Sequence, residues 1–278
     1  MAYLIILASE ILGIKYFMAL QRDPSGSSRF FGDNTSEYVD LRIGSGGISS
    51  GGVLMLGGDD TVDGAITNDL IFGNEGEDII SGGFGNDSLF GGKGRDSMLG
   101  EEGNNFLNGG QDADFLIGGA GNDILLGGKG NDFLASGNGN DTLVGGFGRD
   151  FLAGLGYNNS IKIEGSNLYV LQAEPGVTNI NNVDFITAFR PAFDKIGLAD
   201  GLTVNDVVLE SLTNVTILLS FDVPEAGKPR VSPSILNPAP IVTSGTLIKV
   251  RNSGDLVGFF EGVTPAQLQN SIISVQGF

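Results

Sequence analysis

Aspartate recurs every nine residues through the middle of this chain, and its carboxylate is the side-chain group there best suited to binding a metal ion. Counted from the first glycine of each nine-residue unit, position 6 is acidic in ten of twelve consecutive units. Carboxylate oxygens are ligands for hard cations such as calcium. The chain has no histidine and no cysteine, which excludes thiol nucleophiles, disulfides, histidine bases and the usual zinc sites. The acidic residues at position 6 are Asp60, Asp69, Asp78, Asp87, Asp96, Asp114, Asp123, Asp132, Asp141 and Asp150.

Glycine accompanies the aspartate at positions 1, 2 and 4 in the clearest units, such as GGFGNDSLF from Gly82 and GGKGRDSML from Gly91. Because glycine tolerates positive φ, a turn of this composition can curl tightly and aim carbonyl oxygens inward. Calcium takes about six to eight oxygens, so carbonyls would complete the set that the carboxylates begin. The glycines predicted to help hold the metal are Gly83, Gly85, Gly92, Gly94, Gly119, Gly121, Gly128, Gly130 and Gly145.

The elements that must position these turns are short strands. Position 8 is apolar in all twelve units, from Val62 to Ile161. Six residues of turn and three of strand make half a coil, so two units form one coil and units two apart stack. Stacked carboxylates about 4.8 Å apart would repel one another without a cation. We therefore expect folding to be linked to metal binding.

The units resemble the RTX (repeats-in-toxin) family, whose signature G-G-x-G-x-D-x-U-x they match. The resemblance implies an all-β, right-handed parallel β-roll that binds several Ca²⁺ ions along both edges. It also implies that carbonyls at positions 2 and 4 of one turn meet carbonyls at 1 and 3 of the stacked turn, with both position-6 side chains. Proteins of this kind are commonly bacterial and exported without a cleaved N-terminal signal, which implies an extracellular or cell-surface location.

The two edges of the expected roll differ. One, which we name the continuous edge, carries Asp60, Asp78, Asp96, Asp114, Asp132 and Asp150. The other, the interrupted edge, carries Asp69, Asp87, Asn105, Asp123, Asp141 and Asn159. Its turn at Gly64 also lacks the glycines at positions 2 and 4. We expect better-filled calcium sites on the continuous edge.

Composition narrows the function further. The net charge of −18 argues against nucleic-acid binding, which needs a basic footprint. No HExxH or G-x-S-x-G motif occurs, and the acidic residues fall on the nine-residue grid. We therefore expect that the protein is not an enzyme. Ice binding would need a repeated threonine row, and position 3 shows none.

Three segments are expected. Residues 1–45 include an apolar run over 1–20, which we interpret as a cap over the end of the solenoid. The alternatives are a partner-binding segment and a membrane or export element. No clear transmembrane segment is present. Residues 46–162 form the roll. Residues 163–278 are expected to form a C-terminal antiparallel β unit, with separate strands over 206–209 and 215–221 and a helical turn after Thr264. A proline-rich loop over 222–240 is either a solvated loop or an arm that reaches a neighbouring molecule.

Strand positions 7 and 9 point outward and carry apolar rows, including Phe115, Phe133 and Phe151 on one face and Phe72, Phe90 and Phe106 on the other. Such surfaces need cover, either from the terminal segments or from neighbouring molecules. The sequence therefore favours a calcium-binding extracellular structural protein that folds on calcium binding and self-assembles into a homo-oligomer, filament or lattice. The alternative is a monomeric RTX adhesin or accessory binding module.

Overall fold

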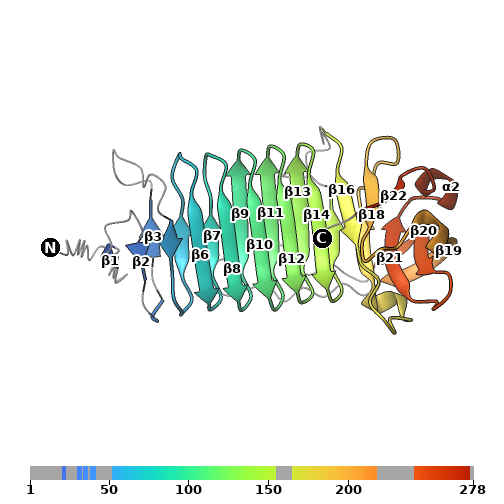
Figure 1. Ribbon diagram of the computed structural model, residues 1–278, viewed down its shortest axis with the longest axis horizontal. Helices are drawn as coiled ribbons and strands as arrows, with labels where there is room; N and C mark the ends of the chain where they lie inside the picture. Colours follow the sequence, from blue (N-terminus) through green and yellow to red (C-terminus); the bar gives the residue numbers. More distant parts are fainter. Residues whose placement is uncertain are drawn as a thin grey trace.

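The computed structural model describes residues 21–22, 30–32, 34–36, 38–41, 52–154, 165–217 and 241–275. These residues form an elongated roll of two parallel sheets, ending in a small antiparallel unit (Figure 1). The described residues do not include the predicted segments 1–20 and 222–240, nor Asn159 and Ile161. The division into the segments 1–45, 46–162 and 163–278 stays a prediction.

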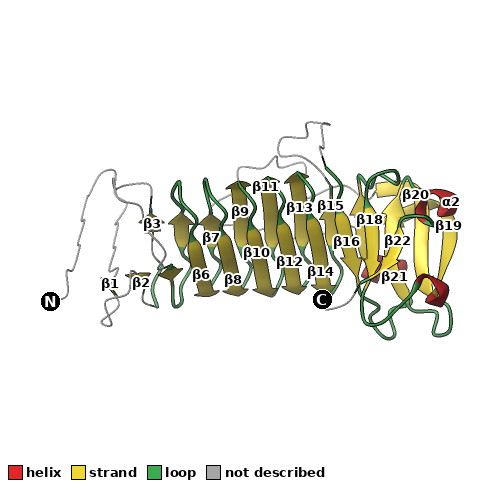
Figure 2. Ribbon diagram, turned by 45° about the horizontal axis from the view of Figure 1, so that its top comes forward, coloured by secondary structure: helices red, strands yellow, loops and turns green. Residues whose placement is uncertain are grey.

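Within the described residues each sheet contains eleven strands, and the chain alternates between the sheets through the repeats (Figure 2). Sheet A runs, in spatial order, through β1 (Gln21–Arg22), β2 (Phe30–Phe31), β4 (Val53–Leu54), β6 (Leu70–Glu75), β8 (Ser88–Lys93), β10 (Phe106–Gln111), β12 (Ile124–Lys129), β14 (Thr142–Phe147), β16 (Leu168–Leu171), β18 (Lys195–Leu198) and β22 (Ile272–Ser274). Sheet B runs through β19 (Val207–Ile217), β20 (Ile241–Val250), β21 (Leu256–Glu261), β17 (Asp184–Thr187), β15 (Phe151–Ala153), β13 (Phe133–Asn138), β11 (Phe115–Ala120), β9 (Ser97–Glu102), β7 (Ile79–Ser81), β5 (Thr61–Asp63) and β3 (Tyr38–Asp40).

The register confirms the eighteen-residue coil. Phe115 pairs with Phe133 and Leu116 with Leu134 between β11 and β13, in parallel. The same offset relates β10 to β12, where Leu107 pairs with Leu125. Units two apart therefore stack, as a nine-residue repeat with one strand per unit requires, and the predicted parallel β-roll is confirmed.

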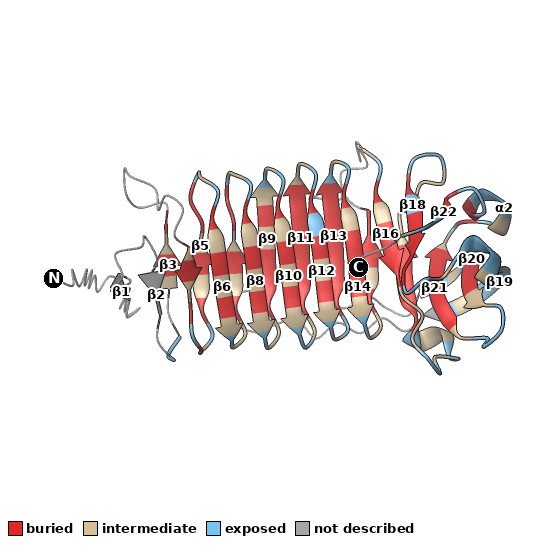
Figure 3. Cartoon of the chain, viewed as in Figure 1, coloured by how far each residue is buried: buried red, intermediate tan, exposed pale blue. Residues whose placement is uncertain are grey.

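The interior of the roll is thin, because each strand contributes one inward side chain at position 8. These side chains form a continuous apolar row along the molecule, seen as the buried stripe across the strands in Figure 3. The row comprises Val62, Ile71, Ile80, Leu89, Met98, Leu107, Leu116, Leu125, Leu134, Leu143 and Leu152, each at most 1% exposed.

The parallel roll continues beyond the repeats. Strand β16 pairs in parallel with β14, and Tyr169 replaces the aliphatic residue of the inward row opposite Leu143. Strand β17 extends sheet B from β15 in the same way, and β18 extends sheet A from β16. The short strand β18 was not predicted.

The predicted antiparallel unit is confirmed, and antiparallel pairing at the C-terminal end is confined to β19, β20 and β21. The two strands predicted over 206–209 and 215–221 are one strand, β19, because a register shift between Leu212 and Val215 keeps both parts paired with β20. Two 3-10 helices, η1 (Ile180–Asn182) and η2 (Val204–Asp206), lie in the connections. The predicted helical turn is α2 (Pro265–Leu268), which Thr264 caps.

Side chains of this unit close the end of the roll's interior. Val207, Ile248, Phe260 and Leu268 belong to the same apolar cluster as the inward row. A solenoid needs such closure, because its last coil otherwise exposes its core.

The outward aromatic rows stack along the roll. On sheet B the ring centroids of Phe115 and Phe133 lie 4.7 Å apart, and those of Phe133 and Phe151 lie 5.2 Å apart. Phe115 and Phe133 are buried, although they point away from the interior row. On sheet A the rings of Phe72 and Phe90 stack at 4.7 Å and are half-buried, while Ile124 is exposed.

Candidate metal centre

The position-6 aspartates form one ladder along each edge of the roll. On the continuous edge the backbone N–H of each aspartate donates to Oδ1 of the aspartate one coil further on. The N–Oδ1 distances are 2.8 Å from Asp60 to Asp78 and 2.9 Å from Asp78 to Asp96. The next three steps, which reach Asp150 through Asp114 and Asp132, are each 2.8 Å. One oxygen of each carboxylate from Asp78 to Asp150 is thereby fixed by the stacked turn.

The second oxygen, Oδ2, is left over. It is buried and has no hydrogen-bond partner in the part of the chain that the structure describes. This holds for Asp78, Asp87, Asp96, Asp114, Asp123, Asp132, Asp141 and Asp150. A buried carboxylate oxygen without a partner costs free energy unless a cation or a proton satisfies it. A row of such oxygens is what a chain of cation sites would present.

Glycine at position 1 makes room beside seven of these eight oxygens, and Ser136 holds that position in the unit of Asp141. A Cβ built on Gly91 falls 2.2 Å from Oδ2 of Asp96 and 2.8 Å from the carbonyl oxygen of Gly109 in the stacked turn. A Cβ on Gly127 meets Oδ2 of Asp132 at 2.3 Å and the Gly145 carbonyl oxygen at 2.5 Å. The position-1 glycine therefore clears the space where a carboxylate and a carbonyl of the next turn converge.

Glycines at positions 2 and 4 have a different purpose. The predicted ligand-bearing glycines at these positions all have φ between +89° and +144°, the left-handed region that favours glycine. They comprise Gly83, Gly85, Gly92, Gly94, Gly119, Gly121, Gly128 and Gly130. Gly145 occupies position 1 and is not among the residues with positive φ. At positions 2 and 4 glycine meets two requirements, because a Cβ on Gly92 would also fall 2.2 Å from the carbonyl oxygen of Asn74. At position 1 free space alone requires it.

Burial raises the pKa of these carboxyl groups, and neighbouring carboxylates raise it further. The pKa of Asp96 is raised to about 8 and that of Asp114 to about 10, in both cases first by desolvation and then by adjacent acids of the ladder. The pKa values of Asp123 and Asp132 are raised to about 7, chiefly by burial. Raised values mean that the fold disfavours the bare anions and favours a bound proton or a metal.

The interrupted edge departs from this pattern where the sequence does. Asp69 turns Oδ2 back on its own turn, where it accepts a hydrogen bond from Ala65 N at 2.7 Å. Asn105 keeps its place in the ladder, because Oδ1 accepts from Asp87 N at 2.9 Å. Its Nδ2 donates to the Gly103 carbonyl at 3.2 Å. This Nδ2 occupies the place beside the position-1 glycine that aspartate Oδ2 occupies in the other turns. These two turns lack the free carboxylate oxygen, but filling of the two edges by calcium stays a prediction.

Sequence reasoning missed three members of the ladders. The continuous edge goes on to Asp184, whose Oδ1 accepts from Asp150 N at 3.1 Å. The interrupted edge goes on to Asn167 and then Asp194, with N–Oδ1 distances of 3.2 and 2.9 Å. After Asp141 the ladder position belongs to Asn167, where the repeat grid placed Asn159. The signal that could have found them is Asp or Asn two residues before an inward apolar residue, as in Asp184 and Ile186.

No three acidic side chains of the described residues converge on one point. Each turn contributes one aspartate, so carboxylates alone do not complete a site, and backbone carbonyls must supply the other oxygens. Calcium suits such a set, since it accepts many oxygen ligands in irregular geometry. Magnesium suits it less, because it demands a near-ideal octahedron. The donor set, the partnerless oxygens and the spaces beside position 1 all fit calcium.

Comparison with known proteins agrees with the geometry. No curated protein matches the chain. No helix of the described residues is long and apolar enough to cross a membrane. Four overlapping windows, residues 56–89, 81–116, 99–134 and 117–152, match the family model of the RTX calcium-binding nonapeptide repeat (4 copies). Over residues 56–152, where the aspartate ladders run, the chain is a β-roll of RTX calcium-binding nonapeptide repeats.

Proposed function

We propose that this protein is a calcium-dependent extracellular structural protein, which folds when calcium binds and assembles with copies of itself into a layer, fibre or matrix. The observation that carries the calcium dependence is the row of buried, partnerless Oδ2 atoms. Several buried anions in one ladder oppose folding until cations bind, so metal affinity becomes folding free energy. RTX repeats are typical of secreted bacterial proteins, and extracellular calcium modules work at about 10⁻⁴–10⁻³ M.

Support for assembly comes from the outer surface of sheet A. Phe72, Phe90 and Phe106 form an aromatic row there, with centroid distances of 4.7 and 5.5 Å. Ile124, further along the same sheet, is 41% exposed. A regular apolar row on a straight, rigid roll suits lateral packing against a second copy.

The second candidate is a monomeric RTX adhesin or accessory binding module. It is favoured by the burial of Phe115 and Phe133, which are only 5% and 3% exposed within a single chain. Those rings are already out of reach of a neighbouring molecule. In neither candidate do we assign a catalytic role.

The test uses the full chain after metal removal. Calcium is titrated while circular dichroism reports sheet content and light scattering reports mass, with magnesium as the control cation. We expect sheet content to rise with calcium and not with magnesium, followed by ordered oligomers. Sheet content that is unchanged without metal would refute calcium-dependent folding. A calcium-folded particle that keeps the mass of one chain at all concentrations would refute assembly and leave the monomeric module.

A further inference from the structure

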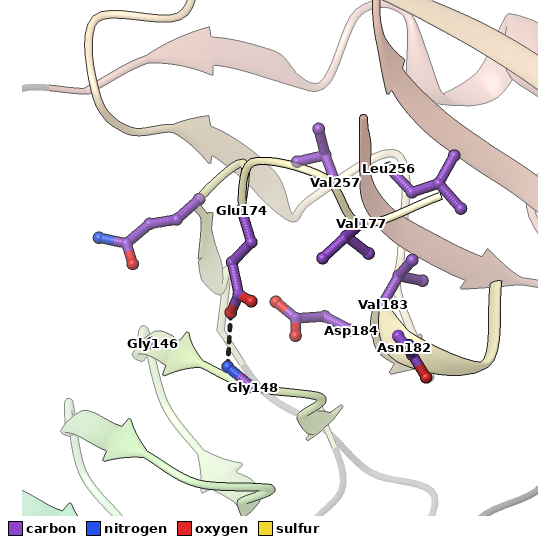
Figure 4. Close-up of a pocket in the computed structure, with 10 residues that line it drawn as sticks. Gly146, Gly148, Glu174, Val177, Asn182, Val183, Asp184, Leu256 and Val257 are labelled. Carbon is purple, nitrogen blue, oxygen red and sulfur yellow. Dashed lines mark hydrogen bonds between the residues drawn. The ribbon is translucent and has the colours of Figure 1, made fainter. Parts of the chain in front are cut away.

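The antiparallel unit at the C-terminal end has one edge joined to the roll and one edge open. Strand β21 pairs in parallel with β17, so that Phe259 faces Phe185. The N–H of Leu256 donates to the carbonyl oxygen of Val177 at 2.8 Å, and both side chains line the small cavity in Figure 4. Strand β20 lies between β21 and β19, and β19 is the outermost strand of sheet B (Figure 1). Among the described residues no strand pairs with the far side of β19.

Length sets β19 apart from the other strands that end the two sheets. In the part of the chain that the structure describes, sheet A ends in β1 and β22, which have two and three residues. The other end of sheet B is β3, with three residues, whereas β19 has eleven. Proteins commonly keep terminal strands short, because a long open edge presents a row of backbone donors and acceptors to any other strand. Three of the four sheet ends follow this rule and β19 does not.

The hydrogen bonds of β20 show which backbone groups of β19 face outward. The N–H of Val250 in β20 donates to the carbonyl oxygen of Asp255 at 2.8 Å, on the side away from β19. Val250 pairs with Val207, so the N–H and C=O of Val207 also point away from the shared ladder. Backbone groups alternate sides along a strand, so those of Leu209 and Ser211 point outward too. No described residue accepts a hydrogen bond from the N–H of Leu209 or Ser211.

The charges at this edge are balanced. Glu210, the acidic residue of β19, is bonded to Lys249 of the neighbouring strand. Asp206 comes just before the strand, where the guanidinium of Arg251 donates to the carbonyl oxygen of Val207 at 3.1 Å. Each acidic side chain here is thus matched by a basic one, in a chain whose net charge is −18. Two copies that repel one another elsewhere can approach at this edge.

We propose that the open edge of β19 pairs with the same edge of a second copy, in antiparallel orientation, and so joins two molecules end to end. Two identical edges related by a two-fold axis fit in this way, because each outward N–H meets an outward carbonyl of the other strand. The stretch that pairs is 207–212, since the register shift between Leu212 and Val215 bends the strand beyond it. Val208, which is 39% exposed in the single chain, is covered in the pair.

The inference rests on the proposed self-assembly and names a contact that is separate from the aromatic row of sheet A. The aromatic row suits packing of rolls side by side, whereas β19 lies at the end of the elongated molecule (Figure 1). The two contacts together extend an assembly in two directions.

Ser211→Pro tests the pairing, because proline removes the outward N–H of residue 211 and is tolerated in an edge strand where that N–H faces solvent. Ser211→Ala is the matched control, since it keeps the N–H. The full-length chains are compared in calcium by circular dichroism, for sheet content, and by sedimentation velocity over a range of concentrations. We expect all three to have the same sheet content, wild type and Ser211→Ala to reach the same mass, and Ser211→Pro to stop at a smaller one. Equal masses for the three folded chains would overturn the pairing.

Hydrogen exchange of the wild-type chain in calcium gives a second measurement, which also decides the matter if Ser211→Pro does not fold. We expect the amides of Leu209 and Ser211 to exchange more slowly as the protein concentration rises, while the exposed amide of Gly201 keeps its rate. Rates at Leu209 and Ser211 that stay constant in a chain that forms oligomers would refute this contact alone. A chain that stays single at all concentrations would refute the proposed self-assembly itself, so the two failures are distinguishable.

Discussion

Replacement of Asp114 by asparagine has opposite expected effects with and without calcium. Asp114 lies in the middle of the continuous edge and is 3% exposed. Its pKa is raised to about 10, first by burial and then by the carboxylates of Asp96, Asp132 and Asp112. An amide fits the ladder, since Asn105 already accepts the backbone hydrogen bond from Asp87 N at 2.9 Å. The substitution therefore removes charge and one free oxygen while the ladder bond remains.

The magnitude follows from the pKa. The folded-state pKa lies above the ordinary value of 3.8, so the protonated side chain stabilises the metal-free fold at low pH. That stabilisation is lost as the pH rises through the raised value. A pH of 7 lies roughly three units above the ordinary pKa of 3.8, which the carboxyl group has in the unfolded chain. This difference corresponds to about 4 kcal/mol of destabilisation of the metal-free fold from this one side chain. We treat this as an upper limit, because the turn can open to admit water. Asp114→Asn should recover much of it in metal-free buffer, and should lower stability in calcium because a ligand is lost.

The assay is urea unfolding followed by circular dichroism, in metal-free buffer and in millimolar calcium. Dialysis is preferable to a chelator, whose affinity changes with pH. If the wild type is unfolded without metal at pH 7, the comparison becomes the pH at which sheet signal is lost, measured above the isoelectric point near 4.1. We expect the variant to hold its sheet to higher pH. A variant that is less stable than wild type in metal-free buffer, or more stable in calcium, would refute the reasoning.

Three further substitutions probe other parts of the ladders. Gly91→Ala places Cβ 2.2 Å from Asp96 Oδ2, so we expect one bound ion fewer by calorimetry and a loss of roughly 1–3 kcal/mol in calcium. Gly57→Ala is the control, because Gly57 has no positive φ and its Cβ would come no closer than 3.5 Å to another atom, and it should keep every ion. Asn105→Asp restores the carboxylate on the interrupted edge, so less calcium should be needed for half-maximal folding, while metal-free stability falls; an unchanged calcium midpoint contradicts this. Arg190→Met leaves Asp194 buried without its cation and should cost about 3–5 kcal/mol in urea unfolding even in saturating calcium; a stability equal to wild type would show that Arg190 does not close that edge.

Much of the candidate site could be predicted because the repeat is local. Each unit carries its own turn glycines, its aspartate and its inward apolar residue, so a nine-residue period determines which residues stack without knowledge of any long-range contact. The ladder from Asp60 to Asp150 and the buried row from Val62 to Leu152 both follow from this period. The reason for glycine at position 1 did not follow, because only packed coordinates show which atom a Cβ would strike.

Where the period ends, the ladder members could no longer be predicted from the sequence. Each of the ladder members Asn167, Asp184 and Asp194 lies 26 to 34 residues beyond the residue whose N–H it accepts from. The chain between them is not repetitive. Their positions depend on the parallel pairing of β16 with β14, of β17 with β15 and of β18 with β16. Such pairing is a long-range choice, set by which apolar side chains extend the interior row.

The sequence by itself determined the fold of the repeats, the cation they suit and the difference between the two edges, because a period of nine converts local composition directly into stacked geometry. Only the tertiary structure decided how each edge ends. On the interrupted edge Arg190 bonds the buried Asp194, and on the continuous edge Glu174 accepts a hydrogen bond from Gly148 N of the last repeat turn. The physical reason is that a closing residue must satisfy groups left open by the last turn, and those groups are brought to it by folding and not by its position in the chain.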